Sequence, residues 1–323
     1  MKENVVKIAI IGGQSGQALN RAAKKRGLYT MLFCGTNTDS GFGEADENYE
    51  IDLSKSEKIT TLIKEKADML LLGTGHELAH NIAKTLYDCK FPVSINPYSA
   101  EYGKDKSKAY AYIKDRGYNC PPYIIVKDKK EWEETNDKSQ IPPCVVKSKN
   151  DKVRTAKAND YNELLVLMEE HIKNKSEAII EKFINGIEYT IPVVSDGKEY
   201  SVLDKALDME DINKIAIGHL RNFTTMDNNY DRKEMMADEA LRREICDSAL
   251  DIAKSMGLVG FVRFDLIVTP NKKIYWLEVN EVSVSALGDG HYPWESVDIY
   301  PAEIMVDNML NMYENECKKK FLQ

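Results

Sequence analysis

Residues 261–280 read FVRFDLIVTPNKKIYWLEVN, two apolar stretches on either side of a Thr-Pro-Asn turn. This pattern predicts a β-hairpin made of two antiparallel strands. Because alternate residues of a strand share a face, Arg263 and Asp265 should lie together on the first strand, and Glu278 and Asn280 on the second. Antiparallel pairing can bring the two pairs onto one surface, which is otherwise made of bulky apolar residues.

The four polar side chains of this hairpin suit a divalent cation. Mg²⁺ takes carboxylate and amide oxygens together with substrate phosphates, and without a cation the two carboxylates would repel each other. The alternative is a solvent-facing polar stripe with cross-strand ion pairs, which is ordinary for a hairpin. The hairpin alone leaves both interpretations open, so the rest of the chain must decide between them.

The composition indicates a folded protein whose partners are small molecules. The chain has 323 residues, of which 43% are hydrophobic and 30% charged, and this length suits two or three lobes. Its net charge of -8 argues against nucleic acid or an anionic membrane as partner, since both attract basic surfaces. No apolar run of about 18 residues could span a bilayer. The start, MKENVVKIAI, lacks the apolar region of a signal peptide, so we expect a cytoplasmic location.

The first 97 residues alternate apolar strands with amphipathic helices, which predicts a parallel sheet covered by helices, a Rossmann-like lobe. Strands are expected at VVKIAII (5–11), YTMLFCG (29–35), ADMLLLG (67–73) and FPVSIN (91–96). The glycine turn at residues 12–16 lacks the glycine that a full dinucleotide fingerprint needs at Ile11, which argues against an NAD-dependent dehydrogenase. The turn is interpreted as a close helix–strand contact or a substrate contact, with anion binding at the helix start as the alternative.

A less regular alternation over residues 98–185 predicts a linker helix followed by a small α+β lobe. Residues 186–323 begin with two strands joined by a turn at 195–197. They continue with an amphipathic helix from Glu239 to Met256 and then the hairpin. The expected fold class is therefore α/β and α+β, in three successive regions.

Five segments, in this order, resemble the motifs of the ATP-grasp superfamily. They are Asp105-Lys106-Ser107-Lys108, Pro143-Cys144-Val145-Val146-Lys147, Ile180-Glu181-Lys182-Phe183-Ile184, Gly186-Ile187-Glu188-Tyr189-Thr190 and the hairpin. By this resemblance the chain is identified as a member of the carboxylate–amine ligase type, similar to D-alanine–D-alanine ligases and to proteins like the carbamoyl-phosphate synthetase large subunit. The resemblance implies an ATP-grasp fold behind a Rossmann-like, pre-ATP-grasp domain.

The resemblance assigns the nucleotide site to residues of the first four motifs. Lys106 and Lys147 would neutralise phosphate oxygens, Lys147 also as a catalytic residue, and Glu188 would hold the ribose hydroxyls. The adenine would lie against a short hinge segment, formed by Glu181, Lys182, Phe183 and Ile184.

The resemblance assigns the metal site to the hairpin. Asp265, Glu278 and Asn280 would carry one or two Mg²⁺ ions, or Mn²⁺, that bridge the phosphates of ATP, so that Glu278 also belongs to the nucleotide site. Arg263 would be catalytic and would stabilise an acyl phosphate. The implied reaction is phosphorylation of a carboxylate followed by attack of an amine, with ADP and phosphate released.

The implied partners are small carboxylates and amines, amino acids among them, and a homodimer is a family-level expectation. Two alternatives stay open: an ATP-grasp carboxylase or formyl-phosphate-type enzyme, and a nucleotide-binding regulatory module without catalysis. The three metal ligands argue against the second alternative.

Two segments depart from the family pattern. Residues 148–154, SKNDKVR, stand where many relatives have a glycine-rich phosphate loop, so side-chain charges replace backbone N–H groups there or the loop is a lid ordered by substrate. Residues 281–288, EVSVSALG, replace the familiar Pro-Gly after the metal asparagine. This second change puts D-alanine specificity in doubt.

Several other side chains are open candidates for substrate contacts. Lys205 could meet a phosphate or the substrate, Arg221 could bind a substrate carboxylate, and His291 could belong to an acceptor site. His76 and His80 lie one helical turn apart, which would suit a metal, but no third ligand is in view. We therefore interpret the pair as a helix start near the cleft between lobes, where His76 could touch substrate.

Overall fold

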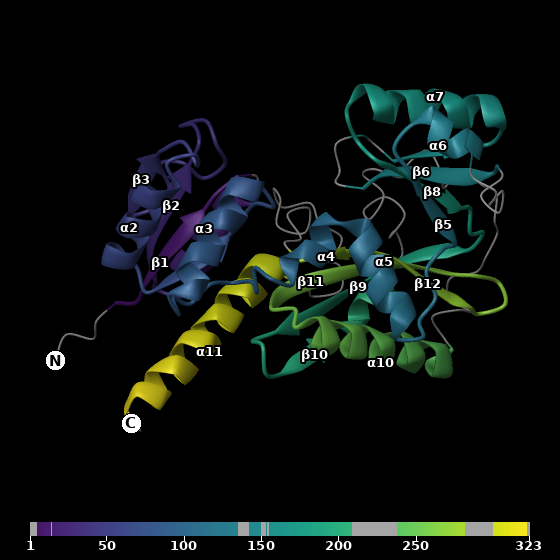
Figure 1. The fold of residues 1–323 in the computed structure, drawn as a ribbon. Coiled ribbons are helices and arrows are strands. Elements are labelled where there is room, and N and C mark those ends of the chain that lie inside the picture. Colours follow the sequence, from purple (N-terminus) through teal and green to yellow (C-terminus); the bar gives the residue numbers. More distant parts are fainter. Residues whose placement is uncertain are drawn as a thin grey trace.

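The computed structural model describes residues 5–13, 15–134, 142–149, 153, 155–208, 238–281 and 300–321. Within these residues the chain forms three four-stranded sheets, each accompanied by helices (Figure 1). The first sheet stands apart from the other two, which lie next to each other in the right half of Figure 1. The predicted division at residues 97 and 185 stays a prediction.

The first sheet is parallel in the order β3-β2-β1-β4, as the sequence predicts for a Rossmann-like lobe. Its strands are β1 (Lys7–Ile11), β2 (Tyr29–Cys34), β3 (Glu47–Glu50) and β4 (Met69–Leu72). Its helices are α1 (Gly16–Lys25), α2 (Ser56–Lys66) and α3 (Glu77–Asp88). Almost every residue of β1, β2 and β4 is buried, because helices cover both faces of a parallel sheet.

The strand expected at residues 91–96 is reduced to one bridge, between Leu70 and Val93. Pro92 has no N–H to donate, although its carbonyl oxygen accepts from Leu70 N at 2.9 Å. One step further along β4, the Leu72 N–H donates to the Ser94 hydroxyl at 3.0 Å instead of to a backbone carbonyl. A proline and a competing side chain therefore stop the ladder on both sides of the bridge.

The second sheet is antiparallel in the order β5-β8-β6-β7. Its strands are β5 (Tyr123–Val126), β6 (Cys144–Ser148), β7 (Ala156–Ala158) and β8 (Ala178–Lys182). Helices α6 (Lys129–Glu134) and α7 (Tyr161–Lys173) pack on it. Val146, Leu164 and Ile180 lie at the centre of this lobe's own apolar core.

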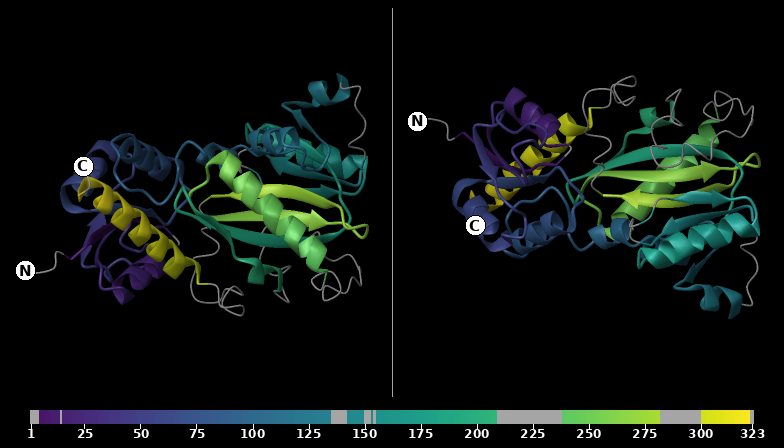
Figure 2. Two further views of the ribbon diagram at one scale, coloured as in Figure 1. Left: turned by 90° about the horizontal axis from the view of Figure 1, so that it is seen from below. Right: turned by 90° about the horizontal axis from the view of Figure 1, so that it is seen from above.

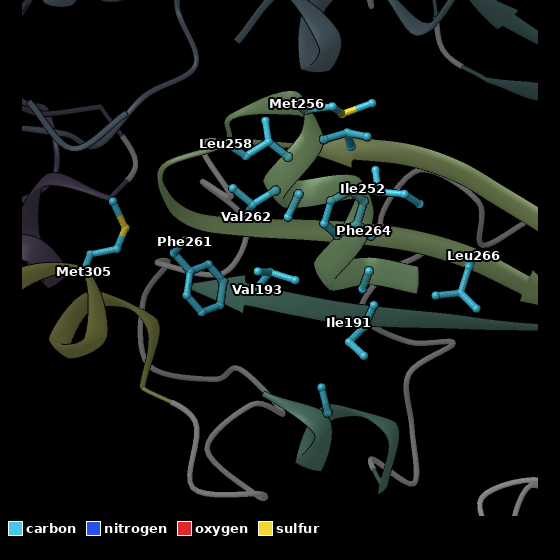
Figure 3. Close-up of a cluster of buried hydrophobic side chains, with 14 of the residues drawn as sticks. Ile191, Val193, Ile252, Met256, Leu258, Phe261, Val262, Phe264, Leu266 and Met305 are labelled. Atoms are coloured by element: carbon cyan, nitrogen blue, oxygen red, sulfur yellow. The ribbon is translucent and has the colours of Figure 1, made fainter. Parts of the chain in front are cut away.

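The third sheet is antiparallel in the order β10-β9-β11-β12 and contains the predicted hairpin. Its strands are β9 (Ile187–Ser195), β10 (Tyr200–Val202), β11 (Gly260–Val268) and β12 (Ile274–Asn280). A 3₁₀ helix, η1 (Asp204–Asp208), follows β10, and α10 (Glu239–Met256) covers one face. Figure 3 shows Ile252 and Met256 of α10 beside Val262 and Phe264 of β11, so this face of the sheet is the apolar one.

Three further helices join the lobes. They are α4 (Ala100–Lys104), α5 (Lys106–Asp115) and α11 (Pro301–Phe321). α5 lies along the edge strand β12, and α11 runs beside the first lobe in both views of Figure 2. Lys25 of α1 pairs with Glu303 of α11 at 2.8 Å, and Arg26 pairs with Asp307. Near the start of α11, Met305 is close to Phe261 of β11 (Figure 3), so α11 fastens the first lobe to the third sheet.

Within the residues described, the structure contains no helix with the length and apolar character needed to cross a bilayer.

Gly260, the first residue of β11, is expected to be intolerant of any side chain. Its φ is +95°, and a Cβ there would lie 2.3 Å from the Ser94 carbonyl oxygen. Gly260→Ala should therefore lower the free energy of unfolding by about 3 kcal/mol, because backbone strain adds to a steric clash. Urea unfolding measures this change.

The matched control is Gly27→Ala. Gly27 also has a positive φ, +73°, but among the described atoms none lies within 4 Å of a Cβ built there. This variant should show backbone strain alone, about 1 kcal/mol. Equal losses in the two variants would mean that the contact with Ser94 relaxes at no cost.

Candidate active site

The hairpin brings its polar residues together on one face of the third sheet, as the sequence predicts. β11 and β12 pair Arg263 with Asn280 and Asp265 with Glu278. On the other side of β11, β9 places Thr190 opposite Asp265. Side chains of directly paired residues point to the same face. The polar cluster therefore consists of five residues: Thr190, Arg263, Asp265, Glu278 and Asn280.

A β-bulge in β12 decides which side chains reach this cluster. Asp265 pairs with Glu278, but the next residue of β11, Leu266, pairs with Trp276, so Leu277 is an extra residue. Without the bulge, Trp276 and Glu278 would share a face. With it, Trp276 packs into the core against Phe264, with ring centroids 5.6 Å apart, and Glu278 faces the polar cluster.

Asp265 is the centre of the cluster and is only 4% exposed. It accepts hydrogen bonds from Thr190 Oγ1 at 2.7 Å, from Arg263 Nη2 at 3.1 Å and from Asn280 Nδ2 at 3.2 Å. Burial raises the pKa of Asp265, Arg263 opposes this, and the charge of Glu278 raises it further. The side chain is thus held firmly and close to another carboxylate.

Lys106 pairs with Glu278, with 3.0 Å between Nζ and Oε1. Lys106 is the first residue of α5, where the Asp105 side chain caps the helix by accepting from Ser107 N at 3.0 Å. Burial works against the ionisation of Glu278. The charges of Lys106, Lys147 and Arg263 outweigh it and hold the pKa of Glu278 below its ordinary value.

Glu188 lies on β9 opposite Ile267 and so shares the face of Asp265. It is 8% exposed. Burial, together with the charges of Asp265 and Glu278, raises the pKa of Glu188 to about 8. Burial is the main cause and the two neighbouring carboxylates add to it, so a cation bound at this face would lower the pKa of Glu188.

Lys147 comes from the second sheet, on β6, and pairs with Glu181 of the neighbouring strand β8 at 2.9 Å. Lys147 Nζ also donates to the Tyr110 hydroxyl at 3.1 Å, and this hydroxyl lies 2.7 Å from Glu181 Oε1. Glu181 is only 2% exposed. Its carboxylate is therefore directed at Lys147 and Tyr110, and the lysine is held by two neighbours.

The hinge after β8 is anchored through its backbone. The Lys182 N–H donates to the Pro122 carbonyl at 2.9 Å, and the Phe183 N–H donates to the Pro143 carbonyl at 3.3 Å. The Lys182 side chain is exposed, and Lys157 Nζ lies 4.2 Å from the centre of the Phe183 ring. The backbone of Lys182 and Phe183 is thus held at the end of the second sheet, beside the start of β6.

The donor set fits Mg²⁺ in type and placement. Asp265, Glu278 and Asn280 supply two carboxylates and an amide on one face, and oxygen ligands of this kind are those Mg²⁺ takes. Asn280 directs Nδ2 at Asp265, so rotation of the amide would present its oxygen. In the described part of the chain, no group of three or more His, Cys, Asp and Glu side chains is placed to hold a metal, as expected for a set with two carboxylates.

Sequence reasoning missed two residues of the site: Thr190, a member of the polar cluster, and Tyr110, which contacts Lys147 and Glu181. The sequence spacing of each residue could have pointed to it. Tyr110 follows Lys106 by four residues and so shares its helix face, and Thr190 follows Glu188 by two residues and so shares its strand face. The residues that could be assigned by motif thus mark the faces on which the others lie.

The weaker candidates fall elsewhere. Lys205 lies in η1, after β10 ends at Val202, and is exposed. His76 caps α3 and its Nδ1 accepts from Leu78 N at 3.2 Å, which confirms the predicted helix start. His80 is 6% exposed, and burial, aided by Lys104, lowers its pKa to about 4.

Other candidates lie outside the described residues. They are Arg221, His291, most of the loop 150–154 and residues 282–288. At the glycine turn after β1, a Cβ at Gly16 would lie 3.3 Å from Leu32 Cδ1 of β2 and 2.8 Å from the Ser40 carbonyl oxygen, so the helix start packs closely on a strand, as predicted.

A parallel first sheet, a small antiparallel sheet with a buried lysine and a third sheet with paired carboxylates define an ATP-grasp protein with a Rossmann-like N-terminal domain. Residues 112–283, more than half of the chain, match the family model described as D-ala D-ala ligase C-terminus. The chain belongs to that family. Family and fold together make it an ATP-dependent ligase that forms carbon–nitrogen bonds.

Three similar proteins illustrate the match. A D-alanine–D-alanine ligase of Clostridium botulinum (strain Eklund 17B / Type B) is 27% identical over 248 residues, which cover 71% of this chain and 78% of the relative. The fold resembles N5-carboxyaminoimidazole ribonucleotide synthetase from Thermotoga maritima, with TM-score 0.66, 21% identity, and 95% and 76% of the two chains covered. It also resembles D-alanine–D-alanine ligase from Bacillus anthracis complexed with ATP, with TM-score 0.64, 17% identity, and 97% and 100% covered.

Proposed function

We propose that this protein phosphorylates a small carboxylate with Mg-ATP and couples the acyl phosphate to an amine, releasing ADP and phosphate. The observation that carries the proposal is the convergence of Asp265, Glu278 and Asn280 on one sheet face, beside Lys106 and Arg263. A solvent-facing polar stripe does not explain this cluster, because Asp265 and Lys106 are each only 4% exposed. The cluster has the charges that a metal-bound triphosphate needs.

The nucleotide is proposed to lie between the second and third sheets. Lys147 from β6 and Lys106 from α5 would contact phosphate oxygens as point charges. An ammonium has three N–H donors, and Glu181 and Tyr110 account for two of those of Lys147. Glu181 then supports the site through Lys147, and Glu188 is proposed to accept from the ribose hydroxyls.

The adenine is proposed to lie against the hinge at residues 182–184. The N–H groups of Lys182 and Phe183 already donate to proline carbonyls. Among the described backbone donors of this segment, the Ile184 N–H is therefore our candidate for a hydrogen bond to the base. Phe183 and Ile184 are half-buried and offer apolar surface to the ring.

Asp265, Glu278 and Asn280 would hold Mg²⁺, which supplies charge neutralisation to the phosphate oxygens. Lys106 and Arg263 balance the same carboxylates in the structure, so both cations lie where phosphate oxygens would arrive. Three cations, Lys106, Lys147 and Arg263, thus surround the reacting region. Their contribution is positioning and electrostatic stabilisation, which dominate phosphoryl transfer.

The reaction itself has two steps. A carboxylate oxygen of the substrate forms a bond to the γ-phosphorus while the bond between that phosphorus and the β–γ bridging oxygen breaks. The amine nitrogen then attacks the acyl carbon, and phosphate leaves with the former carboxylate oxygen. Arg263 is proposed to hold the negative charge that develops on the acyl phosphate.

The substrates are proposed to be amino acids or similar small molecules. The family description and the curated relatives name D-alanine, whereas residues 281–288 of this chain depart from the Pro-Gly pattern. The first of them, Glu281, is buried and accepts from the Ser99 hydroxyl at 2.8 Å. D-alanine is therefore one candidate among several, and association as a homodimer stays a family-level prediction.

An ADP-release screen with Mg-ATP, pooled amino acids and small carboxylic acids tests the proposal. We expect ADP formation that requires both a carboxylate and an amine, and a coupled product lighter than their sum by one water in mass spectrometry. ADP formation with bicarbonate or formate alone would point to the carboxylase or formyl-phosphate alternative. Binding of Mg-ATP without turnover across the panel would point to a regulatory module.

A further inference from the structure

We infer that Tyr110 is a positioning residue of this site, whose hydroxyl holds the phosphate lysine, its partner Glu181 and the bulge that carries Glu278. The inference rests on the proposed function, because it assigns Tyr110 to residues that are proposed to bind Mg-ATP. No sequence motif pointed to this tyrosine.

The Tyr110 hydroxyl connects three elements within hydrogen-bond distance. It accepts from Lys147 Nζ of β6 at 3.1 Å and lies 2.7 Å from Glu181 Oε1 of β8. It also lies 2.6 Å from the carbonyl oxygen of Leu277 in β12. The residue is fully buried. A phenol has one proton to donate, which goes either to the Glu181 carboxylate or to the Leu277 carbonyl at one time, while the phenol oxygen accepts from Lys147. The hydroxyl contacts both sheets, so this single group links the second sheet to the third.

The contact with Leu277 has a specific consequence. Leu277 is the extra residue of the β12 bulge and has no paired residue on β11. The bulge is what turns Glu278 toward the polar cluster while Trp276 stays in the core. By bonding to this carbonyl, the hydroxyl holds the backbone at the residue next to the proposed metal ligand.

Two side chains of helix α5 contact the bulge at successive residues, Leu277 and Glu278. Lys106 meets the Glu278 carboxylate at 3.0 Å, and Tyr110, one helical turn later, meets the Leu277 carbonyl. The Tyr110 ring packs against Tyr123, with ring centroids 5.2 Å apart, so phenylalanine would keep the packing and lose only the hydroxyl. Burial and the charge of Glu181 raise the Tyr110 pKa well above its ordinary value, so the hydroxyl keeps its proton.

Tyr110→Phe tests the inference. We expect kcat/KM for ATP to fall by about 10- to 100-fold, the range for a lost hydrogen bond to charged groups. The Mg²⁺ concentration for half-maximal activity should rise, because the Glu278 backbone is less well held. Both are measured by ADP release, and direct binding of Mg-ATP is measured by calorimetry.

The matched control is Tyr112→Phe. Tyr112 lies on the same helix, and its hydroxyl donates to the Ser255 carbonyl at 2.7 Å, so the two variants lose a comparable bond to a backbone carbonyl. The control should leave the kinetic constants and the Mg²⁺ requirement within about twofold of the unmodified enzyme. A tyrosine with a merely structural role would change stability in both variants and leave the Mg²⁺ requirement unchanged in both.

Glu181→Gln approaches the same contact from the other side and serves if Tyr110→Phe does not fold. It keeps an oxygen acceptor for the hydroxyl and loses the charge opposite Lys147, so kcat/KM for ATP should fall. In the double variant Tyr110→Phe/Glu181→Gln, the fold-loss of kcat/KM for ATP should be smaller than the product of the two single fold-losses, since the two groups act together. Multiplying losses, or an unchanged Mg²⁺ requirement in Tyr110→Phe, would overturn the inference. A wild-type protein that binds no Mg-ATP would instead overturn the proposed function.

Discussion

Glu278→Gln is expected to lower the rate of ADP formation by about 10³-fold, since a lost metal ligand removes several kcal/mol of charge stabilisation. Gln keeps an oxygen near Lys106 Nζ, which lies 3.0 Å from Glu278 Oε1, but it carries no charge to balance a cation. Glu188 and Asp265, whose pKa values Glu278 raises, are relieved of a like charge. We therefore expect a folded protein, and circular dichroism with urea unfolding checks this.

The control for this prediction is Glu303→Gln. Glu303 also pairs with a lysine, Lys25, at 2.8 Å, and its pKa is likewise lowered by that partner. The pair joins α1 to α11, away from the polar cluster. Loss of this charge should leave ADP formation within about twofold. Near-normal turnover in Glu278→Gln would refute the proposed metal role of Glu278.

Arg263→Lys is expected to lower kcat by about 10²-fold while changing KM for ATP much less. Arg263 donates from Nη2 to Asp265 at 3.1 Å and is proposed to face the acyl phosphate. Lysine keeps the charge but loses the planar fork of donors, so the charge that develops in the transition state is less well matched. Steady-state kinetics with the substrates found in the screen separate kcat from KM.

Arg116→Lys is the comparison variant. Arg116 binds both carboxylate oxygens of Asp251 at 2.8 Å with Nη2. It lies on the surface at the C-terminal end of α5, whereas Lys106 of the site begins that helix. Loss of the paired guanidinium donors of Arg116 should leave kcat unchanged and lower the free energy of unfolding by at most about 1 kcal/mol. If Arg263→Lys lowered only the affinity for ATP, Arg263 would be a binding residue and its proposed catalytic role would be wrong.

The parallel first sheet and the antiparallel hairpin followed from local patterns because each pattern reflects a local cause. Buried parallel strands are apolar throughout, as in Met69–Leu72, and a helix that packs on one face repeats its apolar residues, as in Glu239–Met256. The strand expected at residues 91–96 is absent for an equally local reason, although the segment is mostly apolar: Pro92 and Ser94 interrupt the backbone hydrogen-bond ladder.

The sequence predicted that Asp265, Glu278 and Asn280 share one sheet face, which the strand pairing confirms, but it did not predict the residues that support them. The role of the three as metal ligands stays a prediction. Asp265, Glu278 and Asn280 could be named because strand alternation places residues two apart on one face. Thr190 and Tyr110 could not be assigned roles, because their importance comes from contacts with residues 75 and 71 positions away along the chain, Asp265 and Glu181. The ordered motifs pointed to the residues that are proposed to touch a ligand, and they assigned no role to Thr190 or Tyr110.

The sequence by itself determined the parallel class of the first sheet, the antiparallel hairpin, the order of the motifs and the types of side chain available for phosphate and metal. Only the tertiary structure decided how they meet. The bulge at Leu277, the grip of Lys106 and Tyr110 on β12, and the Lys147–Glu181 pair each depend on strands brought together from distant segments. Periodicity fixes which face a side chain occupies, but register and the contacts between lobes arise from packing among all three sheets.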